Sequence, residues 1–481
     1  MQKPCYDQTM NKLTIKEKLG YGAASAGDSI AYSLIGSFLM FFLTTVAGID
    51  PGIAGIISAT GSVWNAMCNP VMGFLSDGIR SKMGKRRPMM LAFSIPLALT
   101  MLLLFTDVNL PQGIKSVYYG VMLMMFWTSY AGYFVPYMAL GAAYTGDYDD
   151  RTVLRLFASL FNMAGNLLSM FAPTMLVEIM VNRGLSTETV WTAVGGILGA
   201  LAAATIIITF FASKKKDSPY SEVTSGVRRS FDLRRIMAEY ISVVRLKPIR
   251  HLVIASLSLL CAYSMIMADM MYFFTFCMGY SGSRITVLLV ARSFMGALMI
   301  PVSARLTAAI DKRGAIILLY AAGAVIMTAL RFFGIGEGPS MWLYLTGLTF
   351  TTVIYWQLMP SIYYDVCEYD RYATGRARQG TIVSFQGLVE ALAVGLGTLI
   401  LGRILRFAGF VSHAAVQSDY AQEWILKCTT VVPLIFIFIG CIAIYRYPLT
   451  REAYRRILDE LTKRDALEDG DLSCDEPAKC D

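Results

Sequence analysis

The strongest constraint on this chain is a series of apolar blocks, each about 20 residues long. An α-helix rises about 1.5 Å per residue, so one block can cross a hydrocarbon core of roughly 30 Å. Backbone groups find no water in lipid, so only helices or a closed barrel can cross it. The blocks lack the alternation of barrel strands, and only 16% of the 481 residues are charged, which predicts membrane helices. We count about a dozen blocks, starting near Gly22, Gly52, Pro88, Val117, Leu156, Val190, His251, Ile285, Ala315, Met341, Gly380 and Cys428.

Basic residues gather in alternate loops between these blocks. Residues 80–87 hold five of them and residues 213–250 hold ten, whereas "AGIDPG" between the first two blocks holds none. Loops rich in Lys and Arg face the cytoplasm. We therefore predict twelve transmembrane helices, both termini in the cytoplasm, and a multi-pass protein of the cell (plasma or inner) membrane. Arg403 and Arg406 fall on the opposite side, and we interpret them as interfacial anchors.

The longest gap between apolar blocks divides the chain into halves. We predict an N-terminal six-helix bundle at residues 1–212, a cytoplasmic central loop at 213–250, a C-terminal six-helix bundle at 251–446 and a cytoplasmic tail at 447–481. Two six-helix halves are the layout of many secondary transporters. The all-α polytopic pattern therefore favours a transporter over a channel, a receptor or a membrane enzyme.

Two shorter signals accompany this division. "GFLSDGIRSKMGKRR" in the first half takes the same place as "ARLTAAIDKRGA" in the second, which indicates a weak internal repeat. In the central loop, "RRSFDLRRIMAEYISVVR" predicts an amphipathic helix. This helix either lies on the inner membrane face or only anchors and links the halves.

Three charged residues within or beside the apolar blocks are candidates for a polar central cavity. A charge at the centre of a membrane helix costs about 2.5–3.5 kcal/mol on insertion scales, so each needs a reason. Asp28 follows the small residues of "YGAASAG", Arg155 begins the fifth block, and Glu390 lies in the eleventh. Because these helices come from both halves, we predict that the three residues line a central substrate site.

Three further charges have a simpler explanation. Asp269, Arg292 and Asp365 also lie in or beside apolar blocks. Pairing between helices, or exposure at a helix end, accounts for them as well as a functional role does. For Asp365 the structural explanation is favoured.

Aromatic and amide side chains in the blocks suggest what the cavity binds. Trp356 offers a flat aromatic face beside the candidate carboxylates and guanidinium, which suits a hydroxylated ring. Tyr130, Gln386, Asn162 and Asn166 could add hydrogen bonds. Packing between helices is the alternative role for Trp356.

The motifs around the second apolar block resemble those of a known transporter group. "NPVMGFLSDGIRSKMGKRRP", "KLGYGAASAGDS", "YYDVCEYDRYATGRARQG" and "YPLTRE" are similar to stretches of the glycoside–pentoside–hexuronide:cation symporters, the melibiose-carrier group of the major facilitator superfamily. The resemblance extends over nearly the whole chain. It implies two six-helix bundles around a central sugar site.

The resemblance assigns roles to several residues of the predicted cavity. Arg155 matches an arginine that contacts the sugar, and Trp356 and Tyr130 match aromatic residues beside it. Gln386 matches a glutamine of helix eleven, and Glu390 lies at or next to a functional lysine. The residues that match the cytoplasmic gate are Asp77, Arg80, Lys85, Arg86 and Arg87, whose bases could pair with acids across the gate.

The cation site of these symporters is degenerate in this chain. Asn65 and Asn69 stand where the relatives have aspartates, and Cys68 stands where they have an asparagine. Ala131 replaces a cation-site threonine, and Phe134 replaces a sugar-binding aspartate. Without the two carboxylates, sodium coupling loses its main attraction, and proton coupling through Asp28 or Glu390 becomes plausible.

We therefore expect a secondary active transporter of a sugar, glycoside or hexuronide, coupled to protons rather than sodium. An uncoupled facilitator of another small solute, or a non-transporting membrane sensor on the same fold, stays open as an alternative. The two histidines form no HExxH motif and no phosphate-binding GxxxxGK[ST] loop occurs, so we expect neither an enzyme nor ATP-driven transport. We expect no cofactor or bound metal, with H⁺ or Na⁺ as the coupling ion. The expected partners are a sugar-like substrate and the lipid bilayer, with no nucleic acid, for a monomeric protein.

Overall fold

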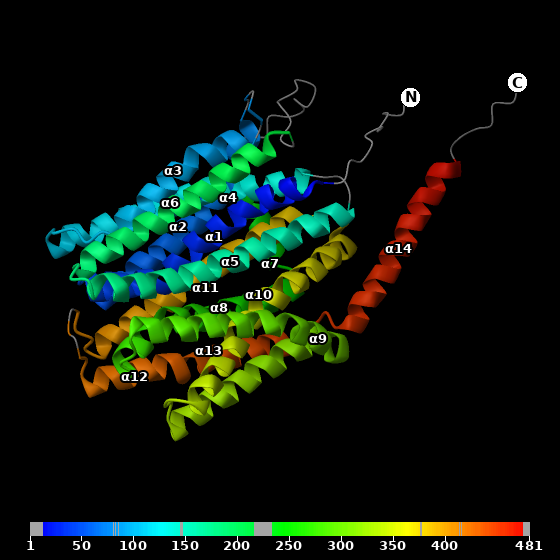
Figure 1. Cartoon of the computed structure of the whole chain (residues 1–481). Helices are drawn as coiled ribbons and strands as arrows, with labels where there is room; N and C mark the ends of the chain where they lie inside the picture. Colours follow the sequence, from blue (N-terminus) through cyan, green and yellow to red (C-terminus); the bar gives the residue numbers. More distant parts are fainter. Residues whose placement is uncertain are drawn as a thin grey trace, which may run out of the picture. The chain divides into compact units, whose positions relative to one another are not determined.

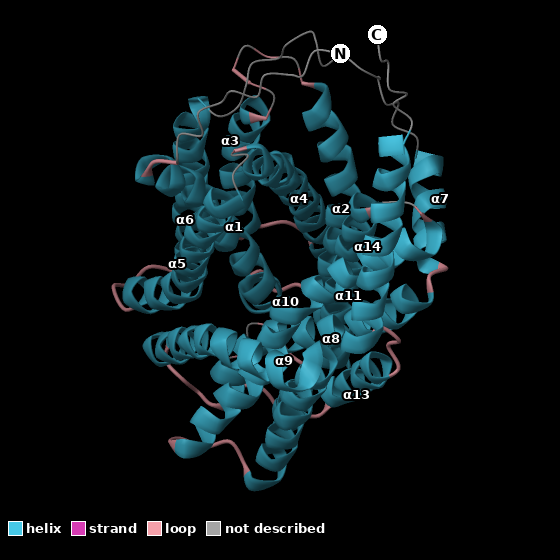
Figure 2. Cartoon of the chain, turned by 90° about the vertical axis from the view of Figure 1, so that its right-hand side faces the viewer, coloured by secondary structure: helices cyan, strands magenta, loops and turns pink. Residues whose placement is uncertain are grey.

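The computed structural model describes residues 13–79, 81, 83–84, 86–144, 148–215, 233–375, 378–412, 414 and 416–474. These residues form helices and loops, with no strand among them (Figure 2). In chain order the helices are α1 (Ile15–Phe41), η1 (Phe42–Val46), α2 (Pro51–Gly78), α3 (Arg87–Leu104), α4 (Gln112–Ala143), α5 (Tyr148–Val181), α6 (Thr187–Ala212), η2 (Ser213–Lys215), α7 (Leu233–Val244), α8 (Lys247–Tyr272), η4 (Phe273–Cys277), α9 (Gly282–Phe333), α10 (Pro339–Thr374), α11 (Gln379–Phe407), α12 (Asp419–Thr430), α13 (Val432–Tyr445) and α14 (Arg451–Cys474) (Figure 1).

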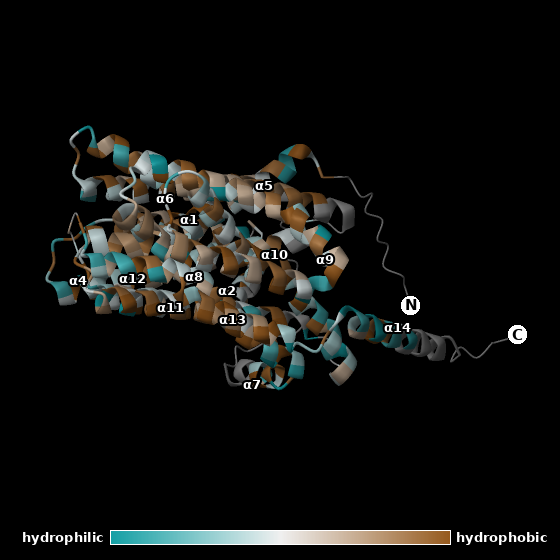
Figure 3. Cartoon of the chain, turned by 90° about the horizontal axis from the view of Figure 1, so that it is seen from below, coloured by the Kyte–Doolittle hydropathy of each residue, from teal (hydrophilic) through white to brown (hydrophobic). Residues whose placement is uncertain are grey.

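The helices match the predicted membrane spans. Eight of the described helical segments are long and apolar enough to cross a membrane, and α2, α4 and α10 are not among them. Helix α9 contains two predicted spans, which meet at Asp311, where a φ of 74° interrupts the helical backbone. The twelve predicted spans therefore correspond to α1–α6, α8, the two parts of α9, α10, α11, and α12 together with α13. The tail helix α14 is longer than the short helix expected there, and it is largely hydrophilic (Figure 3).

Small residues let α1 approach α5 and α6 closely, as "YGAASAG" predicts. A β-carbon on Gly165 of α5 would lie only 2.3 Å from the carbonyl oxygen of Ala26. A β-carbon on Gly27 would lie 2.9 Å from the carbonyl oxygen of Ala202 in α6. Close helix approach at such positions is typical of membrane bundles. It places Asp28, the next residue, near the side chains of the neighbouring helices.

The same type of turn follows both α1 and α8. The π-helices η1 and η4 follow these helices directly. The amide of Ala47 donates to Phe42 O at 2.9 Å, and the amide of Met278 donates to Phe273 O at 3.1 Å. A glycine with positive φ comes next in each case, 70° for Gly48 and 62° for Gly279. Because both turns have the same hydrogen bonds and the same glycine, they support two related halves.

Contacts group the chain into two compact units. The first unit contains residues 1–231, 264–293 and 394–429. The second unit contains residues 232–263, 294–393 and 430–481. The first unit thus includes the end of α8, the start of α9, the end of α11, and nearly all of α12. The bundle boundaries expected at residues 212 and 251 follow chain order and stay a prediction.

Within the first unit, two contacts join segments of the second half to the first half. Gly402 of α11 is so close to α2 that a β-carbon there would lie 2.3 Å from Pro51 O. The carboxylate of Glu178 in α5 accepts hydrogen bonds from the amide and the hydroxyl of Ser283, at the start of α9. An acidic group at a helix N-terminus satisfies free amides and complements the helix dipole. Both contacts lie at the helix ends opposite the basic loops.

In the second unit, the amphipathic helix α7 docks on the ends of α10 and α11. Arg378 donates two hydrogen bonds to the fully buried carboxylate of Asp370, at 2.5 and 3.0 Å. A third hydrogen bond, of 2.6 Å, goes to Ser242 Oγ in α7. The hydroxyl of Tyr240 adds a 3.2 Å bond to Ser384 of α11. The predicted helix of the central loop is confirmed, and these contacts make it part of the second unit.

Candidate functional site

Asp28 is the centre of a polar cluster formed by α1, α4 and α5. Its Oδ1 accepts a 2.5 Å hydrogen bond from the hydroxyl of Tyr130 and a 3.4 Å bond from that of Tyr133. Its Oδ2 accepts a 3.4 Å bond from the amide of Asn162. Tyr130 and Tyr133 are three residues apart and share one face of α4. The first unit therefore brings together Asp28, Tyr130 and Asn162, as predicted.

Aromatic rings surround the Asp28 cluster. The rings of Tyr130 and Phe134 stack at 5.3 Å with an interplanar angle of 17°. Trp127 lies edge-on to Tyr130 at 5.4 Å, and Tyr32 of α1 lies 6.1 Å from it. The resemblance to the melibiose carriers implies an aspartate at the position of Phe134. In this chain the ring of Phe134 instead extends a wall of aromatic side chains. Such a wall can contact the apolar face of a hydroxylated ring.

Glu390 is the centre of a second cluster, within α10 and α11 of the second unit. Its Oε1 accepts a 2.7 Å hydrogen bond from the amide of Gln386 and a 3.2 Å bond from the hydroxyl of Tyr355. Trp356 lies edge-on to Tyr355 at 5.5 Å and to Tyr263 at 5.9 Å. The indole of Trp356 is 39% exposed, so packing between helices does not use its whole surface. The structure thus brings together Gln386, Glu390 and Trp356.

Sequence reasoning missed two residues of these clusters. Tyr133 and Tyr355 each donate to a predicted carboxylate, yet neither was singled out. Tyr133 follows Tyr130 by three residues, and Tyr355 precedes Trp356, so helical spacing was the available signal. The chain has 26 tyrosines. A tyrosine in an apolar block therefore does not by itself predict a hydrogen bond to a carboxylate.

Other predicted residues are placed by their backbone alone or lie outside the described residues. Arg155 lies in α5, two helical turns before Asn162, and Asp77 lies in the last turn of α2. Arg80 and Lys85 are outside the described residues. The contact of Arg155 with substrate and the gate roles of Asp77, Arg80 and Lys85 stay predictions.

The predicted cation-site positions offer neutral groups. The amide oxygens Oδ1 of Asn65 and Asn69 are buried and have no hydrogen-bond partner among the described residues. Cys68 contacts the hydroxyl of Thr128 at 3.7 Å. Cys68 also joins Ala131 in a small apolar cluster between α2 and α4. Within the part of the chain that the structure describes, no three His, Cys, Asp or Glu residues lie together as metal ligands would.

The arginines of the predicted gate bind backbone carbonyls within the first unit. Arg87 donates to Phe210 O in the last turn of α6 at 2.8 Å and lies over the Phe210 ring at 4.4 Å. Arg86 donates to Ala139 O in α4. In the second unit, Arg313 donates in the same way to Ile444 O and Tyr445 O at the end of α13. Cations that bind the last carbonyls of a helix stabilise its end.

The three charges with a structural explanation differ in outcome. Asp365 forms an ion pair of 2.6 Å with Lys312, which confirms pairing for this residue. Asp269 is fully buried, and among the described residues neither of its carboxylate oxygens has a hydrogen-bond partner, so the structure shows neither pairing nor exposure there. Arg292 donates to the sulfur of Met267 at 3.3 Å.

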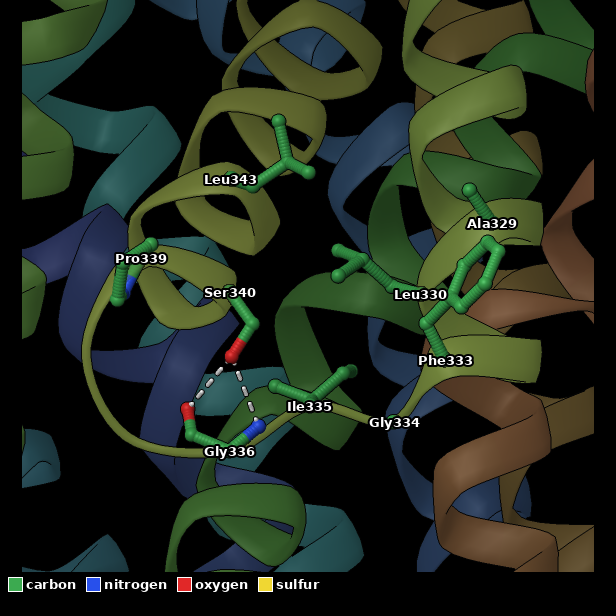
Figure 4. Close-up of a pocket in the computed structure, with 9 residues that line it drawn as sticks. All are labelled: Ala329, Leu330, Phe333, Gly334, Ile335, Gly336, Pro339, Ser340 and Leu343. Atoms are coloured by element: carbon green, nitrogen blue, oxygen red, sulfur yellow. Dashed lines mark hydrogen bonds between the residues drawn. The ribbon is translucent and has the colours of Figure 1, made fainter.

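A separate pocket of about 620 Å³ lies between the second part of α9 and the start of α10 (Figure 4). Its lining is mostly apolar, and the hydroxyl of Ser340 is already bonded to Gly336. None of the predicted site residues lines it. We therefore do not assign the substrate site to this pocket.

Known proteins resemble the chain over almost its whole length. Residues 20–451 match the family described as "MFS/sugar transport protein". The inner membrane symporter YicJ of Escherichia coli (strain K12) is 26% identical over 470 residues, which cover 94% of this chain and 95% of the relative. An isoprimeverose transporter of Lactiplantibacillus pentosus is 22% identical and covers 93% of this chain and 92% of its own length.

Among solved structures, the nucleoside transporter NupG is similar, with a TM-score of 0.65 and 12% sequence identity. The similarity covers 90% of this chain and 100% of that one. At this identity it shows the fold alone. The family match, which names the major facilitator superfamily with sugar transport, and the curated relatives confirm the resemblance to the glycoside–pentoside–hexuronide group. The chain therefore belongs to the MFS/sugar transport protein family, as a multi-pass membrane transporter and not an enzyme.

Proposed function

We propose that this protein is a secondary active transporter that moves a sugar, glycoside or hexuronide by alternating access, coupled to protons rather than sodium. The observation that carries this proposal is the Asp28 cluster, in which a carboxylate, two tyrosine hydroxyls and an amide lie beside aromatic rings. Carboxylates and amides bind sugar hydroxyls, and aromatic rings bind the apolar face of the sugar. The Glu390 cluster offers the same groups beside Trp356.

The relatives support the same class of substrate. One of them is named as a symporter and another as a transporter of isoprimeverose. A hexuronide is the charged variant of this substrate class, and we propose that Arg155 would bind its carboxylate, since arginine suits planar anions.

The neutral groups at the predicted cation site support the proposal of proton coupling. Asn65 and Asn69 offer amide oxygens, and Cys68 and Ala131 lie in an apolar cluster. Sodium binds well where carboxylates supply negative charge, which these positions lack. Asp28 and Glu390 can instead take up a proton during the cycle. We further propose that the transporter is a monomer in the cell membrane, with both termini in the cytoplasm.

The test is uptake by proteoliposomes of labelled glycosides and uronides under imposed proton or sodium gradients. We expect a proton gradient, inward for protons, to drive accumulation. Sodium-driven accumulation would contradict the coupling proposal. Uptake that never exceeds equilibrium would indicate the uncoupled facilitator, and binding without uptake would indicate the sensor.

A matched pair of variants tests the site itself. Asp28→Asn removes the charge that Tyr130 and Asn162 bind, so substrate binding should be lost. Glu188→Gln makes the same change of acid to amide at an exposed position in the first turn of α6. Equal substrate affinity in the two variants would contradict the assignment of Asp28.

A further inference from the structure

Asp269 is a buried acid that the proposed substrate site does not use. It lies in α8, within the apolar stretch "SMIMADMMYFF". The residue is 0% exposed, and neither Oδ1 nor Oδ2 has a hydrogen-bond partner within the part of the chain that the structure describes. Among the described residues it is the carboxyl group whose two oxygens are both buried in this way. Asp28 and Glu390, by contrast, each accept hydrogen bonds from a hydroxyl and an amide.

An ionised carboxylate is unstable in such a place. Moving an unpaired charge from water into a dry interior costs far more than a hydrogen bond returns, so the group neutralises instead. A carboxylate neutralises by forming an O–H bond with a proton from water. In this structure, therefore, the surroundings of Asp269 suit the neutral acid.

The titratable groups around Asp269 do not supply a counter-charge. Tyr272, three residues later, shares its helix face. The hydroxyl of Tyr272 donates to Met40 O of α1 at 2.9 Å and contacts Thr44 of η1 at 2.5 Å. Cys277 of η4 and Cys428 of α12 also interact electrostatically with Asp269, and a thiol carries no positive charge.

The nearby cations are engaged elsewhere. Arg292 of α9 donates to the sulfur of Met267, two residues before Asp269 and thus on another face of α8. Lys427 of α12 binds Glu423 at 2.9 Å and lies over the ring of Trp424. Among the described residues, no charged group donates a hydrogen bond to Asp269.

The burial of Asp269 depends on packing that belongs to the first unit. Helix α8 is divided between the compact units after Tyr263, and residues 264–293 belong with residues 1–231. The bonds of Tyr272 to Met40 and Thr44 join this end of α8 to α1 and η1. When these helix ends separate during alternating access, water reaches Asp269, and the acid can ionise.

We propose that Asp269 is a proton-binding site of the transport cycle, in addition to the acids of the substrate clusters. The acid holds its proton while the end of α8 is packed against α1, and releases it to water when the two separate. This inference rests on the proposed function, since only a transporter opens and closes these helix ends in turn. The ligand of the site is the proton alone.

Infrared spectroscopy of the purified protein in lipid tests the site without any substrate. A neutral carboxylic acid has a C=O stretching band that a carboxylate lacks. We expect the wild type to have such a band at neutral pH and Asp269→Asn to lose the component that Asp269 contributes, while Glu188→Gln keeps the wild-type band. A band that is unchanged in Asp269→Asn would overturn the proposal. The same holds if Asp269→Asn and Asp269→Val both fail to fold, because a neutral, unpartnered acid tolerates a neutral replacement.

Transport measurements test the role in coupling. We expect Asp269→Asn to exchange substrate across the membrane and to lose proton-driven accumulation. Accumulation with the pH dependence of the wild type would overturn the proposal. If the wild type itself transports no substrate, the proposed function fails, and the infrared result alone then decides whether Asp269 holds a proton.

Discussion

Asp28 and Glu390 are bound by the same pair of groups, a tyrosine hydroxyl and a side-chain amide. Tyr130 and Asn162 bind the first, and Tyr355 and Gln386 bind the second. These donors lower the free-energy cost of burying a carboxylate inside a membrane protein. A substrate hydroxyl can replace one donor without leaving the acid bare. The residues that hold the acid therefore also determine how tightly substrate binds.

The hydroxyl of Tyr130 can be removed without removing its ring. In Tyr130→Phe the stack with Phe134 remains, but Asp28 loses its shortest hydrogen bond. We expect substrate affinity to fall about tenfold, which equals about 1.4 kcal/mol. Tyr118→Phe in the same helix, α4, is the control, because the hydroxyl of Tyr118 donates to Leu103 O of α3 and not to Asp28. Isothermal titration calorimetry measures both, and equal affinities would contradict the prediction.

The neutral cation site can be given charge. Asn65→Asp with Asn69→Asp places two carboxylates at buried oxygens one helical turn apart. Two like charges repel, so we expect a lower melting temperature in potassium buffer and a rise on adding sodium. The wild type in the same buffers is the control and should show no sodium-specific rise. If sodium does not change the melting temperature of the double variant, the two carboxylates do not suffice for sodium binding. Cys68 and Ala131 would then also determine whether the site binds sodium.

At the scale of elements, close helix packing depends on single glycines. A β-carbon on Gly402 would lie 2.3 Å from Pro51 O and 3.0 Å from Gly55 Cα, so Gly402→Ala must move α11 away from α2. We expect faster hydrogen exchange at the start of α2, and a larger loss of turnover than of substrate affinity. Gly387→Ala in the same helix meets nothing within 4 Å and is the matched control. Similar exchange in both variants would contradict this account.

Arg378 holds helix α7 on the second unit. Arg378→Met leaves the fully buried carboxylate of Asp370 with only the hydroxyl of Thr374 as a donor and without its ionic partner, and it frees Ser242. We expect the docking of α7 to weaken by about 3 kcal/mol, because the lost bonds are charge-assisted and one partner is buried. Hydrogen exchange over Leu233–Val244 measures this, with the exposed Arg245→Met as control. Unchanged exchange would mean that apolar contacts alone hold the helix.

At the scale of the whole molecule, the compact units do not follow chain order. The first unit takes residues 264–293 and 394–429 from the second half. Neither half alone can bury these surfaces. We expect residues 1–231 and 232–481, expressed as separate chains in one cell, to copurify. The first half expressed alone should aggregate or be degraded, and its isolation as a stable monomer would contradict the prediction.

Some residues of the candidate site could be predicted from the sequence. Asp28 and Glu390 stood out because charges are costly within apolar blocks. Tyr133 and Tyr355 did not, because a tyrosine is ordinary in such a block and its partner lies on a distant segment. The isolation of Asp269 was equally hidden, since pairing and its absence look the same in sequence. The sequence predicted a structural role for Asp365, such as pairing between helices. It did not identify the partner, Lys312, which lies 53 residues earlier.

The sequence by itself determined the helical membrane fold, the expected number of spans and the family. These follow from the length of apolar blocks, the side on which basic residues gather, and short motifs, all of which are local along the chain. Only the tertiary structure decided which donors reach Asp28 and Glu390, where Arg87 and Arg313 bind, and that no described residue donates a hydrogen bond to Asp269. These facts depend on which side chains of helices that are distant in the sequence are in contact. Small residues such as Gly165 and Gly402 allow the helix backbones to approach closely, and this approach determines which side chains meet.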